Sequence, residues 1–98
     1  MYVVVHHWFR NPQVAFSRGV KLMTNDGAPS GVRVLQFYPN KDGSGATCLW
    51  EAPAVAPVQR YVDSVLGDSS DNKCFEIDGE QAFSQLPLGM RVSAAIPA

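Results

Sequence analysis

The residues of this sequence that could do chemistry are few, and the most distinctive are the adjacent histidines His6 and His7. Neutral imidazole is a common ligand for nickel, zinc and copper. Adjacent residues of a strand point to opposite faces, so the pair cannot chelate one ion from a single regular strand. A metal site would need one histidine together with acids from neighbouring strands. The alternative is that each histidine is a hydrogen-bonded core or edge residue.

Two glutamates stand in otherwise apolar segments, and buried carboxylates of this kind mark functional sites more often than surface ones. Glu51 immediately precedes a predicted helix, where a negative charge stabilises the helix N-terminus. For Glu76, a site residue and a surface acid are both open. One choice of strand register places His6 on the same face as Glu76 and Gln36, so His6 and Glu76 are the predicted metal ligands.

The sequence is also rich in aromatic residues for its length. These side chains could line a pocket for a flat apolar ligand, or they could be plain core and interface. The residues predicted to form such a ligand pocket are His6, Trp8, Gln36, Trp50 and Glu76. The sequence contains no phosphate-binding loop and no nucleophile elbow, and its glycine-rich stretch at 42–45 is typical of a hairpin connection.

Six segments must position these residues. Runs of β-branched and aromatic residues predict strands, and apolar spacings of three and four predict helices. The predicted strands are 2–9, 32–38, 46–51 and 73–78, and the predicted helices are 13–23 and, from a start at 54–56, a second one ending at 66.

The first predicted helix has a clear start. Asn11 can cap it by accepting a backbone N–H bond, and Pro12 suits the first helical position. Its apolar face is predicted to be Phe16, Val20 and Met23. Glycine weakens a helix interior by about 1 kcal/mol relative to alanine, so close packing at the glycine of position 19 would be a compensation.

The order of these segments is β-α-β-β-α-β. With right-handed crossovers it predicts a ferredoxin-like α+β sandwich, with the antiparallel sheet order 4-1-3-2 and both helices on one face. We expect a single domain at 1–78. We expect residues 79–98 to be a C-terminal extension that packs on the domain or on a dimer partner, and a short helix at 80–84 is one option within it.

The predicted sheet has more apolar surface than one layer of helices can cover. The chain is 46% hydrophobic over 98 residues, and both faces of the first two strands carry apolar side chains. Large uncovered apolar faces usually contact a partner. The sequence therefore predicts a homodimer that packs sheet against sheet, as a dimeric α/β barrel.

Other features restrict the class of protein. The formal net charge is −1 with no basic run, which argues against nucleic-acid binding. No apolar stretch reaches the ~20 residues of a membrane span. Cys48 and Cys74 are expected to be free thiols on strands separated by a third, and a cytoplasmic location is expected.

The sequence also resembles a family. The stretch from Cys48 to Pro53 (CLWEAP), the helix that follows it, and the aromatic–glutamate pair Phe75-Glu76 resemble a family of small actinobacterial ferredoxin-like homodimers of unknown function, some of which bind nickel. The first strand of that family tends to carry a histidine, which His6 could match. The resemblance covers about residues 2–78 and implies nickel or another divalent metal as the ligand.

The function expected from the sequence is therefore binding of a small ligand or a transition metal. The first alternative is a small cofactor-independent monooxygenase-like enzyme acting on a flat aromatic or apolar substrate, with His6 or His7 and Trp50 at its site. The second alternative is a structural or interaction domain. The fold hosts all three classes, so it does not choose among them.

Overall fold

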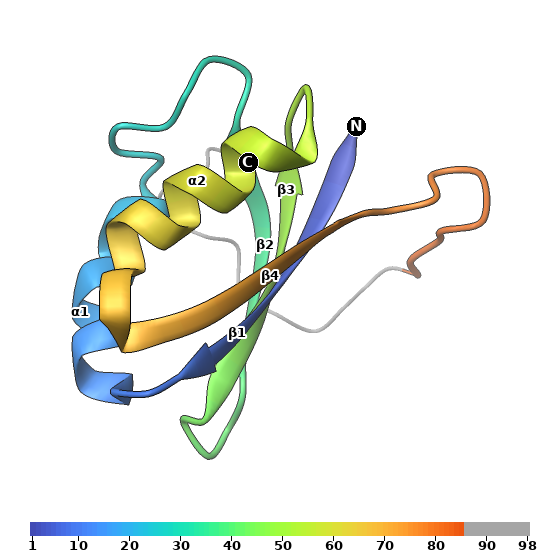
Figure 1. The fold of residues 1–98 in the computed structure, drawn as a ribbon. Helices are drawn as coiled ribbons and strands as arrows, with labels where there is room; N and C mark the ends of the chain where they lie inside the picture. The colour runs from blue at the N-terminus through green and yellow to red at the C-terminus, as the bar shows by residue number, and fades with distance from the viewer. Residues whose placement is uncertain (86–98) are drawn as a thin grey trace.

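The protein is an α+β domain with one antiparallel four-stranded sheet and two helices on one face of it (Figure 1). A computed structural model describes residues 1–85. The strand order is β2-β3-β1-β4, which confirms the predicted order and is consistent with a ferredoxin-like fold. The elements are β1 (Tyr2–Phe9), α1 (Pro12–Met23), β2 (Arg33–Pro39), β3 (Gly45–Glu51), α2 (Val55–Leu66), a 3-10 turn (Gly67–Ser69) and β4 (Ser70–Glu76).

Strand β4 begins earlier than the sequence predicts. Its first three residues, Ser70, Asp71 and Asn72, are polar and have the composition of a turn, yet they pair with Phe9, Trp8 and His7 of β1. Sheet pairing uses backbone groups, so a neighbouring strand can recruit residues whose side chains do not favour strands. This extension places Asn72 directly opposite His7.

Helix α1 begins as predicted, with the Asn11 side chain accepting a hydrogen bond from the Val14 N–H and a proline in its first turn. The predicted apolar face is buried only in part: Met23 packs against the core, and Phe16, Val20 and Met23 all line one pocket. The buried residues are Ala15 and Leu22, whereas the side chain of Phe16 is 42% exposed and that of Val20 is 60% exposed. Helix α1 packs against α2 and, through Leu22, on the strands, while Phe16 and Val20 border an open space between α1 and the sheet.

The sheet has one helix-covered face and one open face. Val3, Val5 and His7 of β1 point toward the helices and are buried, and the alternating residues of β1 point to the other side. The core between sheet and helices is built on Trp50, Leu22, Val58 and Val62. An irregularity between Val34 and Gln36 in β2 places Gln36 opposite Leu49, on the open face.

The part of the extension that the structure describes contains no helix. Residues 79–81 form a turn and 82–85 are irregular and exposed, so the predicted helix at 80–84 is wrong. Residues 86–98 lie outside the described part, and so does most of the predicted packing of the extension. Within residues 1–85, none of the helices has the length and apolar content needed to cross a membrane.

Candidate functional site

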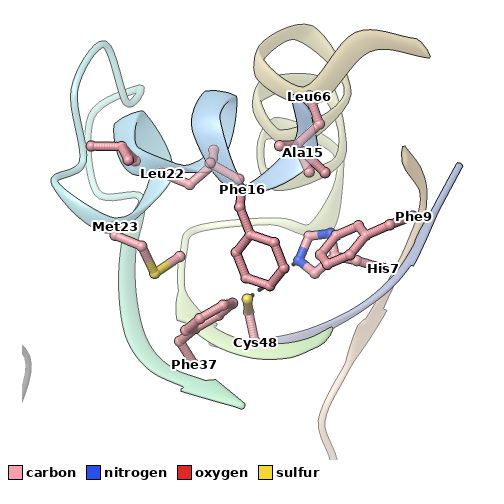
Figure 2. Close-up of a pocket in the computed structure, with 11 residues that line it drawn as sticks. His7, Phe9, Ala15, Phe16, Leu22, Met23, Phe37, Cys48 and Leu66 are labelled. Carbon is pink, nitrogen blue, oxygen red and sulfur yellow. Dashed lines mark hydrogen bonds between the residues drawn. The ribbon is translucent and has the colours of Figure 1, made fainter. Parts of the chain in front are cut away.

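A pocket of about 210 Å³ lies between α1 and the helix-covered face of the sheet (Figure 2). Apolar side chains from α1, α2 and three strands make most of its wall, among them Phe9, Phe16, Val20, Met23, Phe37 and Leu66. The partly exposed Phe16 and Val20 of α1 form its rim. His7 and Cys48 supply the polar atoms, and Figure 2 shows both side chains and Phe16 pointing toward one another.

The His7 ring is held at both nitrogens. Its Nδ1 lies 2.7 Å from Oδ1 of Asn72, and its Nε2 lies 3.3 Å from Sγ of Cys48. All three residues belong to adjacent strands, because β1 lies between β3 and β4. The sheet register therefore fixes the imidazole at the floor of the pocket.

The hydrogen bonds of Asn72 determine which nitrogen of His7 carries the proton. The Asn72 Nδ2 group donates to Oδ1 of Asp63 at 3.0 Å, and its Oδ1 accepts from the Ser70 hydroxyl at 2.7 Å. A carboxylate only accepts, so the amide NH₂ must face Asp63 and the amide oxygen must face His7. Two acceptors cannot face each other at 2.7 Å, so neutral His7 carries its hydrogen on Nδ1 and has a lone pair on Nε2.

Helix α2 holds this chain of hydrogen bonds against the sheet. Gln59 donates to the Asp63 carboxylate at 3.1 Å and to the backbone carbonyl of Asn72 at 2.9 Å, and its Oε1 accepts from the Cys74 N–H at 3.1 Å. One glutamine thus ties α2 to β4 and keeps Asp63 beside Asn72. The chain from Asp63 to Cys48 is a fully connected polar network under an apolar pocket.

Burial keeps both polar groups of the pocket neutral. The pKa of His7 lies below its ordinary value of 6.5, first because burial penalises the imidazolium; the neighbouring His6 lowers it further, while Asn72 and Asp63 raise it. Burial also raises the pKa of the Cys48 thiol to about 12. At neutral pH the site contains a neutral imidazole that faces a protonated thiol, so the thiol hydrogen can point at Nε2.

Two glycines shape the site. A Cβ atom at Gly45 would lie 2.1 Å from the carbonyl oxygen of His7, so β3 can approach β1 at this point only with glycine there. At Gly19 in α1, a Cβ atom would meet only Cδ2 of Leu66, at 3.8 Å. Close packing therefore does not require Gly19, and its missing side chain leaves room in the pocket that it lines.

The residues predicted for the ligand pocket do not come together. His6, Trp8 and Gln36 lie on the open face, whereas Trp50 is fully buried in the core beside Tyr61. Glu76 pairs with Val3, and His6 pairs with Lys73, so the register places Glu76 and His6 on opposite sides of the sheet. The register that would have joined them in a metal site is therefore not the one adopted.

No group of three or more His, Cys, Asp or Glu residues that could hold a metal ion occurs within residues 1–85. His6 instead lies 3.2 Å from the Thr47 hydroxyl through Nδ1, and its ring contacts Trp8 and Phe75 at centroid distances of 5.9 and 5.6 Å. Glu51 forms an ion pair with Arg33 across the β2–β3 pair at 2.9 Å. These contacts describe an aromatic surface with a charged edge rather than a coordination sphere.

Both cysteines are free, as expected. Cys48 and Cys74 each pair with Val5, from opposite sides of β1, which confirms the predicted separation by one strand. Cys48 is buried and Cys74 is half-buried. The sequence predicted Cys48 as a free thiol on a strand and did not connect it with His7.

Sequence reasoning did not place His7 in its set of pocket residues, and it missed Asn72 altogether. The signal for His7 was available, because Val3, Val5 and His7 alternate along one face that ends in a polar ring. Asn72 could not be found in this way, since it falls in a stretch with turn composition. Phe16 and Val20 were identified, but as packed residues rather than as the rim of a pocket.

Comparisons with protein-family models, with curated proteins and with solved structures find no significant match to this chain. The resemblance to the nickel-binding family therefore stays a prediction from its motif. The function has to be argued from the pocket and the open face.

Proposed function

We propose that this protein binds a small, flat, apolar molecule in the pocket between α1 and the sheet. The observation that carries the proposal is the pocket itself, about 210 Å³ in volume with a wall of aromatic and aliphatic side chains. An apolar cavity of about 150 Å³ is enough to take up benzene. The pocket has the size for a substituted single ring.

The composition of α1 supports this reading. The partly exposed side chains of Phe16 and Val20 at the rim are the kind of surface that a bound apolar molecule would cover. Gly19, which weakens the helix by about 1 kcal/mol relative to alanine, is compensated by no tight contact. Space for a ligand is a physical reason to have glycine there.

The test is binding of ethylbenzene, followed by isothermal calorimetry and by changes in methyl NMR signals of pocket residues. We expect saturable binding with a Kd of roughly 1 mM or tighter. Gly19→Leu, which places a side chain in the pocket, should abolish binding. Ser17→Leu, on an exposed part of the same helix, is the matched control and should bind like the wild type. Absence of saturable binding to the wild type would overturn the proposal.

The second element of the proposal is a homodimer formed through the open face of the sheet, that is, the surface containing Tyr2, His6, Trp8, Leu49 and Phe75. The side chains of Tyr2, Trp8 and Phe75 are 48%, 55% and 39% exposed, which is a large aromatic surface for a small domain. The same face carries both signs of charge on β4, with Asp71 and Lys73 two residues apart. An exposed apolar surface with both signs of charge is the kind of surface that a two-fold dimer buries, which supports the proposal.

The enzyme alternative has one observation in its favour, which is the buried imidazole at the pocket wall. A neutral histidine is a usual general base, and the Nε2 lone pair of His7 has only the weak thiol donor of Cys48 as its partner. An enzyme would also have to bind its substrate in this pocket, so the binding test applies to the enzyme alternative too. Nickel binding rests on the resemblance alone, and titration of nickel into the wild type and into His6→Ala tests it.

A further inference from the structure

The lone pair on Nε2 of His7 is the one strong hydrogen-bond acceptor among the side chains that line the pocket. The remaining wall consists of hydrocarbon groups, the Met23 thioether and the Cys48 sulfur, which are weak acceptors. A ligand enclosed here has a single place to satisfy a polar hydrogen.

The group that now faces the Nε2 lone pair of His7, the Cys48 thiol, is a poor hydrogen-bond donor. The Cys48 sulfur lies 3.3 Å from Nε2, and a thiol is a weak donor. A hydroxyl group is a stronger donor and prefers a shorter distance. The acceptor is therefore fixed in place but is not used fully by the protein.

Hydrogen bonds on the Nδ1 side of the His7 ring hold the Nε2 acceptor in place. Asn72 holds Nδ1–H, Asp63 orients the amide of Asn72, and Gln59 orients the Asp63 carboxylate. These groups come from two elements, β4 and α2, and moving the hydrogen of neutral His7 from Nδ1 to Nε2 would break the hydrogen bond to Asn72. The pocket thus distinguishes a donor from an acceptor on its ligand.

We infer that the ligand of this pocket is a small neutral aromatic molecule with one hydroxyl donor, a phenol, whose O–H group replaces the Cys48 thiol as the hydrogen-bond partner of His7 Nε2 while its ring lies among the phenylalanines. This inference rests on the proposed apolar-ligand function and specifies its ligand class. No proton is transferred in the complex: the phenol keeps its hydrogen and His7 stays neutral. Asn72 and Asp63 are positioning residues that act through His7.

The experiment compares three probes of similar size, namely para-ethylphenol, ethylbenzene and para-methylanisole, whose oxygen has no hydrogen. Each is titrated into the wild type and into His7→Phe, which keeps a ring in place of the imidazole. The measured quantity is the ratio of the phenol affinity to the ethylbenzene affinity. We expect this ratio to fall by roughly tenfold in His7→Phe, because an enclosed hydroxyl without a partner loses its hydrogen bond to water. The ratio of methylanisole to ethylbenzene should change little.

A second readout does not depend on a variant that folds. In the wild type, para-ethylphenol should shift the ¹⁵N resonance of His7 Nε2, and para-methylanisole should leave it close to its unliganded position. If ethylbenzene binds but the affinity ratio is the same in both proteins and the resonance does not move, the phenol inference is wrong and the apolar-ligand function stands. If no probe binds the wild type, both are wrong.

Discussion

The side chains of His7 on β1 and Asn72 on β4 are directly opposed in the sheet, with Nδ1 and Oδ1 2.7 Å apart. Because Asn72 is itself oriented by Asp63, this contact sets the tautomer of the histidine and leaves its Nε2 lone pair facing the Cys48 thiol at the pocket wall. The backbone pairing of β1 with β4 thus determines which ring nitrogen of His7 carries the hydrogen. The predictions below test this contact, the packing around it and the surface on the other side of the sheet.

The stability of the protein should depend on the ionisation of His7. Its pKa is lowered in the folded state, so the unfolded chain binds a proton more readily. The free energy of unfolding therefore has its full value, as far as His7 is concerned, above pH 6.5. It decreases as the pH falls from 6.5 toward the lower pKa of the folded state, by at most about 1.4 kcal/mol per pH unit. Urea unfolding at pH 7.5 and pH 5.5 measures it.

His7→Phe removes this titration and should show a smaller loss of stability between the two pH values than the wild type. His6→Gln is the control, because His6 lies on the opposite face and lowers the pKa of His7 less than burial does. An equal loss in the wild type and in His7→Phe would show that other groups, such as the carboxylates, cause the pH dependence.

Gly45→Ala should destabilise the protein and disturb the site. The added methyl group would overlap the His7 carbonyl oxygen at 2.1 Å, so β3 or β1 must move. Overpacking of this kind costs roughly 1–3 kcal/mol. Chemical denaturation measures the loss, and the His7 ring resonances should shift as well.

Gly19→Ala is the matched comparison, since its new methyl group meets only Leu66, at an ordinary contact distance. It should stabilise the protein by about 0.5–1 kcal/mol through helix propensity. A stability loss at Gly19 as large as that at Gly45 would contradict the assignment of Gly45 as the site of close strand approach.

The open face should be responsible for self-association. Trp8→Glu places a charge on the exposed aromatic surface and should convert a dimer into a monomer, as measured by sedimentation equilibrium at micromolar concentration. Ser64→Glu on the outer side of α2 adds the same charge elsewhere and should leave the dimer intact. A wild-type protein that is monomeric under these conditions would refute the dimer.

Both thiols should react slowly in the folded protein. Burial raises the pKa of Cys48 and of Cys74 to about 12, so very little thiolate is present at neutral pH. Alkylation by iodoacetamide should be roughly tenfold or more slower than in urea, with Cys48 slower than the half-buried Cys74. Mass spectrometry of timed samples separates the two, and a fast reaction at Cys48 would mean that its cavity opens readily.

The sequence by itself determined the elements and their topology. The β1 strand, the Asn11 cap of α1, the start of α2 near Val55 and the sheet order follow from local composition, spacing and the handedness of crossovers. These are short-range properties, and the rules that govern them can be applied without coordinates. The separation of the two cysteines by one strand follows from the same order.

The tertiary structure alone decided the site. Strand register assigned His6 and Glu76 to opposite faces, and no local pattern specifies how one strand is aligned with a distant one. Packing of α1 on α2 left Phe16 at the rim of a space instead of in the core. Pairing with β1 extends β4 to include the polar residue Asn72, which therefore lies opposite His7. Each of these outcomes depends on contacts between residues far apart in the chain, where the sequence offers only the residue types.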